Sequence, residues 1–414
     1  MTLLDKLLSG RIREGTLNII DRHGESKTYG TQSAGWPDVI MRIHHPAAER
    51  RILMNPRLGL GEAYIDGIVT VDDEDIMGLV ELVRRNNPWE KGGEIGSPGA
   101  LKRIAGQLAR PLLQLNSLAK SRANVAHHYD LSNDFYRLWL DEDMQYSCAY
   151  WADGMTTLDE AQSAKKAHIA AKLALEPGQR VLDIGCGWGG MALYLNRIAD
   201  VEVLGITLSE EQFKLATERA EAAGVANKVR FELVDYRDLA RKVPGCFDRI
   251  VSVGMFEHVG APQFETFFRC AANMLKDDGL MLLHTIGRLG KPGATDAFTR
   301  KYIFPGGYIP ALSETLAASE KMKLIATDIE NLRLHYALTL RAWYARVREQ
   351  RQTIIELMDE RFYRMWAFYL AGATGAFESG GMCNYQLQFA RDRLSLPITR
   401  DYMTEAEATL RAKD

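Results

Sequence analysis

Three glycines stand at the spacing of a nucleotide-binding turn. Residues 181–190 read VLDIGCGWGG, an apolar strand that ends in a glycine turn and opens a helix. Gly185, Gly187 and Gly190 fit the G-x-G-x-x-G pattern, in which glycine lets the backbone turn tightly and lie against a ligand with no Cβ in the way. The next predicted strand ends at Thr207 without the acidic residue that a dinucleotide site uses for the ribose hydroxyls. This argues against a dinucleotide.

Four further segments carry side chains that could do acid–base or nucleophilic chemistry. They are residues 126–151 with His128, Tyr129, Tyr146, Ser147 and Cys148, residues 251–260 with Glu257 and His258, residues 282–287 with His284, and residues 334–344 with Tyr336, Leu340 and Trp343. His284 and Glu257 end adjacent predicted strands beside the glycine loop, where a doubly wound sheet binds its ligands. We therefore expect His284 and Glu257 to be functional. Taken singly, each residue also has a structural explanation. A histidine at a strand end is more often structural, Cys148 suits a small buried apolar position, and Tyr336 and Trp343 suit a hydrophobic core.

The elements that must position these residues follow from strand–helix alternation. We predict strands at 180–184, 201–206, 229–234, 248–254, 279–286 and 324–330, with helices between them, and note a final apolar stretch at 384–391. This order is typical of an α/β fold with a doubly wound parallel sheet that binds ligand at the carboxyl ends of its strands. The insertion at 287–323 and the helices at 335–372 exceed the basic fold, and we expect them to form a lid or wall over that edge.

The length and composition indicate a two-domain enzyme. The chain has 414 residues, a hydrophobic content of 46% and a net charge of −3, so nothing draws it generally to nucleic acid. Five cysteines without a Cys-x-x-Cys pair argue against a disulfide framework and a zinc site, and we expect no metal. The first residues are too charged for a signal peptide, and no apolar run is long enough to span a bilayer. We expect a cytoplasmic protein.

We divide the chain into three parts. Residues 1–90 form a small N-terminal α+β domain, residues 91–122 a glycine-rich linker with a basic amphipathic helix, and residues 123–414 the catalytic domain. The helical part carries Lys102, Arg103 and Arg110 and no acid, so it could lie on an anionic lipid surface. It could equally be an interdomain helix with a solvated basic edge.

A family resemblance sharpens these expectations. The form Asp183-x-Gly185-x-Gly187 resembles the first motif of S-adenosylmethionine-dependent methyltransferases. The blocks QYSCAYW (145–151), VLDIGCGWGG (181–190), VSVGMFEHVG (251–260), LLHTIG (282–287) and KYIFPGGYIP (301–310) closely resemble the cyclopropane fatty-acyl-phospholipid synthases, which include mycolic acid cyclopropane synthase-like methyltransferases. The resemblance implies a seven-stranded Rossmann-like methyltransferase sheet, and it extends more weakly over the N-terminal residues.

The resemblance also implies a reaction. A cis double bond in a phospholipid acyl chain attacks the methyl group of S-adenosylmethionine, a carbocation forms, and a bound bicarbonate removes a proton so that a cyclopropane ring closes. An olefin is a weak nucleophile, so the site must align it and exclude water. The residues that match the bicarbonate ligands are Cys148, Glu257, His284, the backbone of Ile286 and Tyr336, with His128 lining the same pocket. Glu257 and Tyr336 would orient the anion, and Cys148 and His284 would donate to it.

For the cofactor, the resemblance implies contacts along the whole molecule. Tyr146 and Ser147 match residues that hold the methionine end of the cofactor. Gly185 and Gly187 match residues that lie along the cofactor, and Asp183 steadies their loop. Thr207 and Gln212 match contacts to the ribose, and Tyr236 or Arg237 would border the adenine. The implied partners are a membrane phospholipid with an unsaturated acyl chain, an anionic membrane surface on the inner face of the cell membrane, and a second copy of the chain in a homodimer.

Several alternatives stay open at this stage. The same site could form a methyl- or methylene-branched lipid instead of a ring, or it could methylate a small amine. A third hypothesis is a lipid-binding protein without catalytic activity. The intact set Cys148, Glu257, His284 and Tyr336 favours cyclopropanation. Arg300 and Lys301, beside an apolar glycine-rich turn, could meet a lipid headgroup or gate the acyl tunnel, or could be solvated surface cations.

Overall fold

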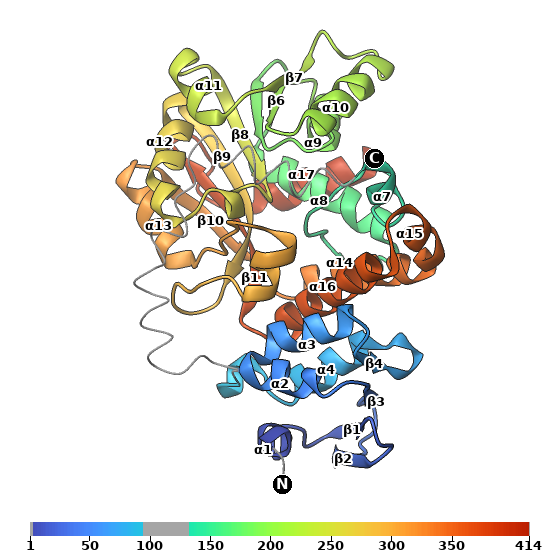
Figure 1. Ribbon diagram of the computed structural model, residues 1–414. Coiled ribbons are helices and arrows are strands. Elements are labelled where there is room, and N and C mark those ends of the chain that lie inside the picture. The colour runs from blue at the N-terminus through green and yellow to red at the C-terminus, as the bar shows by residue number, and fades with distance from the viewer. Residues whose placement is uncertain (1–2, 94–131, 414) are drawn as a thin grey trace. The chain divides into compact units, whose positions relative to one another are not determined.

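The computed structural model describes residues 3–93 and 132–413, which form two compact units (Figure 1). The first unit comprises residues 3–93, 296–305 and 337–382, and the second comprises residues 132–295, 306–336 and 383–413. The predicted basic helix at 101–122 and His128 lie outside the described residues. Within the described ranges, no helix combines the length and the apolar character needed to cross a membrane.

The second unit is built on a seven-stranded sheet in the order β10-β11-β9-β8-β5-β6-β7. The strands are β5 (Arg180–Ile184), β6 (Glu202–Thr207), β7 (Val229–Leu233), β8 (Phe247–Val253), β9 (Leu275–Arg288), β10 (Ile325–Asn331) and β11 (Met382–Ala390). Pairing is parallel from β9 through β8, β5 and β6 to β7, and β10 runs antiparallel to β11. The predicted doubly wound α/β fold is confirmed, and every predicted strand of this sheet is present.

Helices cover both faces of this sheet (Figure 1). On one face pack α11 (Tyr236–Lys242), α12 (Phe264–Met274) and α13 (Leu312–Lys321), and on the other α8 (Leu158–Leu173), α9 (Gly190–Ala199), α10 (Glu210–Ala222) and α17 (Asp401–Lys413). Central strands are apolar on both sides because both sides are covered, which is why VLDI at 181–184 is a continuous buried run rather than an alternating one. The carboxyl ends of β5, β6, β8 and β9 therefore share one edge.

Two of these helices have strong N-terminal caps. The Thr157 hydroxyl accepts a hydrogen bond from the Glu160 N–H at 3.2 Å, and the Glu160 carboxylate accepts one from the Thr157 N–H at 3.0 Å, which is a reciprocal capping box at the start of α8. The Ser209 hydroxyl caps α10 by accepting from the Gln212 N–H at 3.3 Å. Such caps are each worth about 1 kcal/mol, and they fix where α8 and α10 begin beside the sheet edge.

The first unit combines a four-stranded sheet with helices from two distant parts of the chain. Its strands β1 (Gly15–Ile20), β2 (Ser26–Thr31), β3 (Asp38–Ile43) and β4 (Val69–Val71) take the order β2-β1-β3-β4. Its helices include α1 (Leu3–Leu8), α2 (Ala47–Met54), α3 (Pro56–Ile65), α4 (Ile76–Arg85), α15 (Arg351–Leu357) and α16 (Glu360–Glu378), together with most of α14 (His335–Glu349). The sequence analysis did not foresee α3 or β4.

Ion pairs and close packing join the two parts of this unit. The guanidinium of Arg341 on α14 pairs with Glu81 at 2.8 Å and with Glu378, and the guanidinium of Arg351 pairs with Glu74 at 3.0 Å. Residues 337–382, which we placed with the catalytic domain, thus fold with the N-terminal residues. That the insertion and these helices cover the ligand edge of the sheet stays a prediction.

Two glycines of α16 test this packing. A Cβ at Gly375 would lie 2.7 Å from Val80 Cγ1 and 2.9 Å from Arg84 Cγ on α4, whereas a Cβ at Gly372 would meet nothing within 4 Å. We expect Gly375→Ala to lower the free energy of unfolding by about 1–3 kcal/mol through overpacking. Gly372→Ala should raise it by about 0.5–1 kcal/mol, because alanine favours the helix. Calorimetric unfolding of the full chain measures both, and shifts of the same sign would contradict the close approach of α4 and α16.

Candidate active site

Three loops meet at the carboxyl edge of the large sheet. A Cβ at Gly185, after β5, would lie 2.7 Å from Met255 Cβ, in the loop after β8. A Cβ at Gly254, in that same loop, would lie 3.8 Å from Ser147 Cβ. The structure therefore brings together the glycine loop, the start of the 254–258 segment and the QYSCAYW segment, as expected from the topology.

The glycines of the loop serve two different purposes. Gly185 and Gly187 have φ of +84° and +53°, in the left-handed region that L side chains rarely adopt, and a Cβ at Gly187 would face open space. At Gly190, by contrast, a Cβ would collide with the side chains of Asp143 and Gln145. Gly187 leaves the backbone accessible to a ligand, Gly185 lets the loop after β8 approach closely, and Gly190 lets the 141–147 segment pack against the start of α9.

Asp183 ends β5 as a buried carboxyl group. It is 1% exposed, and within the described residues its Oδ2 has no hydrogen-bond partner. Burial raises the pKa of Asp183 to about 7, although the charge of Lys165 acts in the opposite direction. An orphaned buried oxygen beside a ligand-accepting loop fits a ligand that carries donors, such as the ammonium group at the methionine end of S-adenosylmethionine.

Aromatic rings hold Tyr146 beside the glycine loop. The Tyr146 ring lies 5.6 Å from that of Tyr136, at the end of helix α7 (Asn133–Arg137), and 5.4 Å from that of Trp139. Tyr136 in turn lies 5.0 Å from Trp188 of the loop, whose indole N–H donates to Asn133 at 2.8 Å. This cluster fixes the position of Tyr146 relative to the glycines.

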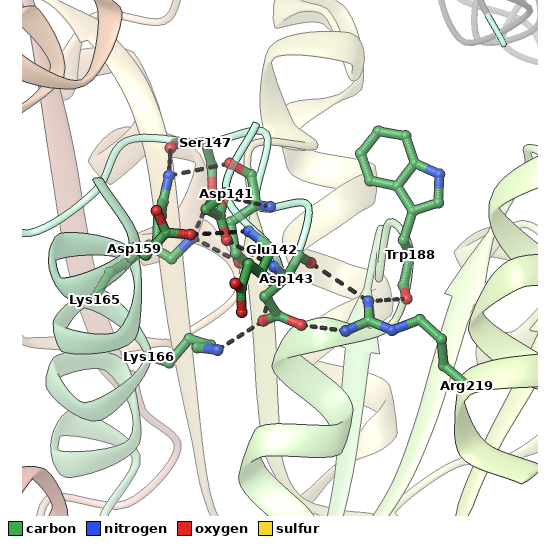
Figure 2. A network of polar contacts seen from close by, with 11 residues as sticks. Asp141, Glu142, Asp143, Ser147, Asp159, Lys165, Lys166, Trp188 and Arg219 are labelled. Atoms are coloured by element: carbon green, nitrogen blue, oxygen red, sulfur yellow. Dashed lines mark hydrogen bonds and ion pairs between the residues drawn. The ribbon is translucent and has the colours of Figure 1, made fainter. Parts of the chain in front are cut away.

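Ser147 is held by α8, in the network of Figure 2. Its hydroxyl oxygen accepts a hydrogen bond from the Lys165 ammonium at 2.9 Å, and its carbonyl accepts one from the Gln162 amide at 3.0 Å. Sequence reasoning missed Lys165, because a lysine in a helix usually reads as a solvated charge. The pattern of α8 offered no clear signal, because Gln162 and His168, at i−3 and i+3, share the helix face of Lys165.

The expected ribose residues lie together at the end of β6. The Thr207 hydroxyl donates to Gln212 Oε1 at 2.9 Å, and both side chains are buried. Because the Gln212 oxygen faces Thr207, its amide nitrogen faces the other way and can donate. The N–H groups of Gly185 and Cys186 donate to the carbonyl of Ile206, at 2.9 and 3.1 Å, so this strand end is tied to the glycine loop.

Tyr236 and Arg237 have strong local partners. The Tyr236 ring packs edge-on against Phe267 at 5.4 Å within the core. The Arg237 guanidinium is bonded to both oxygens of Asp235, at 2.8 and 2.7 Å. These contacts favour structural roles, and the placement of either residue at the adenine stays a prediction.

Glu257 is a buried carboxyl group with one oxygen bonded and one free of protein contacts. It is 8% exposed; Oε1 accepts the Ile286 N–H at 2.6 Å, and Oε2 is buried with no hydrogen-bond partner among the described residues. Burial raises the pKa of Glu257 to about 7, although the Ile286 hydrogen bond favours the ionised form. Near neutral pH, this group therefore exists partly as a neutral acid that can donate from Oε2.

His284 is fully enclosed and neutral. It is 1% exposed, and its Nε2 and Nδ1 lie 3.0 Å and 3.1 Å from the side-chain amides of Asn384 and Gln386 on β11. Burial holds the pKa of His284 well below its ordinary value. A neutral imidazole has one N–H and one acceptor nitrogen, so it accepts a hydrogen bond from one of these amide nitrogens. The other amide satisfies the ring N–H when it turns its oxygen toward the ring. Sequence reasoning did not identify Asn384 and Gln386.

Cys148 and Tyr336 complete the expected set. Burial raises the pKa of the Cys148 thiol, so it stays protonated, and it donates to the Ala149 carbonyl at 3.3 Å. Tyr336 is buried at the start of α14, and the preceding His335 accepts the Trp151 N–H at 2.8 Å. The start of α14 therefore lies against the segment that carries Cys148. Within the described residues, no group of three or more His, Cys, Asp or Glu side chains is placed to hold a metal.

A pH series tests the state of Glu257. Between its ordinary pKa of 4.5 and its folded value of about 7, the unfolded chain has released the proton and the folded protein retains it. The stability from this group is therefore complete below about pH 4.5 and is lost as the pH rises through 7. Relative to Glu257→Gln, the unfolding free energy of the unmodified protein should fall by about 2–3 kcal/mol between pH 5 and pH 8. Urea unfolding measures both; parallel profiles would show that Glu257 ionises normally.

Comparisons with known proteins agree with this geometry. The mycolic acid cyclopropane synthetase family model matches residues 116–387. The chain is 42% identical over 354 residues to the cyclopropane-fatty-acyl-phospholipid synthase of Escherichia coli K12, covering 85% of this chain and 87% of that protein. It is 34% identical over 374 residues to the tuberculostearic acid methyltransferase UfaA1 of Mycobacterium tuberculosis, covering 84% and 83%.

Solved structures give the same result. The cyclopropane synthase MmaA2 from Mycobacterium tuberculosis superposes with a TM-score of 0.62 at 35% identity, covering 65% of this chain and 98% of that one. The mycolic acid cyclopropane synthase CmaA1 complexed with SAH and CTAB gives 0.62 at 34%, covering 67% and 99%. A coclaurine N-methyltransferase, 22% identical with a TM-score of 0.64 over 80% of this chain and 98% of its own, shares the fold. The chain belongs to the mycolic acid cyclopropane synthetase family of S-adenosylmethionine-dependent methyltransferases.

Proposed function

We propose that the protein is a cyclopropane-fatty-acyl-phospholipid synthase. It transfers the methyl carbon of S-adenosylmethionine to a cis double bond of an unsaturated phospholipid acyl chain and closes a three-membered ring. The observation that carries this proposal is Glu257, a buried carboxyl group held at 2.6 Å by the Ile286 N–H, whose second oxygen has no hydrogen-bond partner in residues 3–93 and 132–413. Such a group is poised to hold a small anion in a dry site.

The residues of the glycine loop and the QYSCAYW segment suit the cofactor. Ser147 and Asp183 offer a hydroxyl and a carboxyl group for the methionine end, and the backbone beside Gly187 is open. Gln212 offers an amide donor for the ribose. When bound, S-adenosylmethionine supplies an electrophilic methyl group, and the SAH bound in CmaA1 supports this choice of cofactor.

Burial of the site serves an olefin substrate. A carbon–carbon double bond attacks an electrophile only when water, a better nucleophile, is excluded and the reacting atoms are aligned. Cys148, Glu257 and His284 are all buried, and each is neutral or partly neutral near pH 7, so the site gathers polar groups without gathering charge. In such a site, a developing carbocation meets no water and loses its proton to the bound base.

The same residues suit bicarbonate as that base. The protonated Glu257 carboxyl is a donor for an oxyanion. The Cys148 thiol becomes a second donor by turning its single proton away from the Ala149 carbonyl, and Tyr336 lies at the start of the adjoining helix. Bicarbonate held there would accept the proton lost from the new methyl group. The Ile286 N–H already donates to Glu257, so it supports the anion through that side chain. His284 can join the donors only by exchanging one of its two amide partners for the anion.

Substitution of Glu257 tests this function. Glu257→Gln retains the shape and a donor but cannot exchange a proton at Oε2, so we expect binding of S-adenosylmethionine within about two-fold of the unmodified protein. Turnover should fall by about a hundred-fold or more, as when a positioned acid–base or oxyanion group is lost. The assay uses vesicles of monounsaturated phospholipid and labelled methyl donor. A rate equal to that of the unmodified protein would remove Glu257 from the mechanism.

The same assay distinguishes a second candidate function. The similarity to UfaA1, named a tuberculostearic acid methyltransferase, favours a methyl- or methylene-branched fatty acid as the alternative product. A methylene-branched chain and a cyclopropane chain have the same mass, so mass spectrometry cannot separate them. Nuclear magnetic resonance of the extracted acyl chains can. Ring methylene protons support the synthase, and exomethylene or methyl-branch protons alone would replace it with the fatty acid methyltransferase.

We further propose that the protein acts as a homodimer on the inner face of the cell membrane. Lys102, Arg103 and Arg110, in a segment without acidic residues, supply charge for an anionic lipid surface. At the other basic site, Lys301 pairs with Glu62 at 2.5 Å within the first unit, which favours a structural role there.

Charge reversal tests the membrane contact. The triple variant Lys102→Glu, Arg103→Glu and Arg110→Glu should bind anionic vesicles at least ten-fold more weakly at low salt, because each basic residue near an anionic surface is worth about 1 kcal/mol. The difference should shrink at high salt as the charges are screened. Co-sedimentation with vesicles measures it, and equal binding at low salt would leave the segment with an interdomain role.

A further inference from the structure

Lys165 is a buried ammonium group that forms no ion pair with any described residue. It lies on α8, is 0% exposed, and donates to Gln145 Oε1 at 2.7 Å and to Ser147 Oγ at 2.9 Å (Figure 2). Among the described residues, no carboxylate lies within ion-pair distance of its Nζ. A buried charge is normally paired, because burial removes several kcal/mol of hydration energy. Burial accordingly lowers the pKa of Lys165 to about 8.

The acids around Lys165 do not supply the missing negative charge. Asp143 is bonded to Lys166 at 2.7 Å and to Arg219, so its charge is already matched (Figure 2). Burial raises the pKa of Asp141, and it raises that of Asp183 to about 7. Asp183 is thus partly neutral near pH 7. Asp141 acts on Lys165 only through space, because its two oxygens accept hydrogen bonds from the Gln145 N–H at 2.9 Å and the Asp143 N–H at 3.2 Å. The charges of the side chains around Lys165 therefore leave a positive charge that one anionic group of a ligand can match.

The hydrogen bond from Lys165 decides what Ser147 can do. A hydroxyl group has one proton, and because the ammonium can only donate, the Ser147 oxygen must act as the acceptor in this pair. Its own proton is therefore free to point elsewhere. The Gln162 amide fixes the Ser147 backbone carbonyl at 3.0 Å, and the Ser147 side chain lies beside Gly254 at the sheet edge. Ser147 is held there as a hydrogen-bond donor.

We propose that Lys165 is a positioning residue for the methyl donor. It holds Ser147 as a donor to the carboxylate at the methionine end of S-adenosylmethionine, and its charge is the counter-charge of that carboxylate. This inference rests on the proposed function for the identity of the ligand. It adds a specificity: the protein distinguishes the complete amino-acid end of the cofactor from an otherwise identical molecule that lacks the carboxylate.

The test compares two ligands and two variants by isothermal titration calorimetry. S-adenosylmethionine and decarboxylated S-adenosylmethionine differ only in the carboxylate. Lys165→Met keeps the apolar stem and removes the charge, and Lys172→Met removes another buried ammonium of α8, whose partners Glu330 and Asp328 keep His168 and Arg400. Lys165→Met should weaken binding of S-adenosylmethionine about ten- to a hundred-fold, the effect of a charge-assisted hydrogen bond. Binding of the decarboxylated ligand should change less than two-fold.

A control variant and a double-mutant cycle give the results that would contradict the proposal. Lys172→Met should change binding of either ligand less than two-fold. Ser147→Ala should give the same carboxylate-selective loss as Lys165→Met, and the double variant should lose no more than the larger single loss. If Lys165→Met does not fold, Lys165→Gln, which keeps a donor without charge, should show a smaller loss with the same selectivity. Equal losses for both ligands would make Lys165 merely structural, and no loss would exclude the proposal.

Failure of this inference is separable from failure of the proposed function. If the unmodified protein binds S-adenosylmethionine and modifies olefinic lipids while Lys165→Met binds as before, only the role of Lys165 is overturned. If the unmodified protein does not bind S-adenosylmethionine, the proposed function itself is wrong.

Discussion

The site depends on one constraint, the attachment of the 141–148 segment to helix α8 and to the glycine loop by buried polar contacts. Lys165 and Gln162 hold the segment from α8, while Asp143, bonded to Lys166 and Arg219, ties it to the loop that contains Trp188. Polar groups are costly to bury unpaired, so the bonds that these residues make favour one position of the segment over others. That position determines where Ser147 and Cys148 stand relative to the strand ends.

A second feature is the low charge of the site. Glu257 and His284 are buried, and desolvation moves each toward its neutral form. The backbone N–H of Ile286 and the amides of Asn384 and Gln386 hold their orientation without adding charge. An electrophilic donor and an apolar acyl chain can share the part of the site beside Glu257 and His284, because neither side chain carries a full charge that would attract water there. The base of the proposed reaction is therefore a bound bicarbonate ion and not a charged side chain.

Local patterns predicted the large sheet and its glycine loop well. Apolar runs such as VLDI and the glycines after it depend on neighbours a few residues away, and the structure places each strand within a few residues of expectation. Sequence patterns did not predict the contacts between distant parts of the chain. The amides that hold His284 come from β11, about a hundred residues later. The packing of residues 337–382 with the N-terminal residues depends on side-chain pairs such as Arg341 with Glu81. Lys165 was missed because its burial is decided by what surrounds α8, not by its own neighbours in sequence.

The most direct measurement is a crystal structure of the protein with S-adenosylhomocysteine, bicarbonate and a long-chain lipid analogue. The account predicts the ligand carboxylate on the Ser147 hydroxyl with Lys165 still bonded behind it, a bicarbonate ion on Glu257 Oε2, and the alkyl chain beside the sulfur. A ligand carboxylate bound away from Ser147, an alkyl chain that cannot reach the sulfur, or a Glu257 closed off from any anion would contradict it.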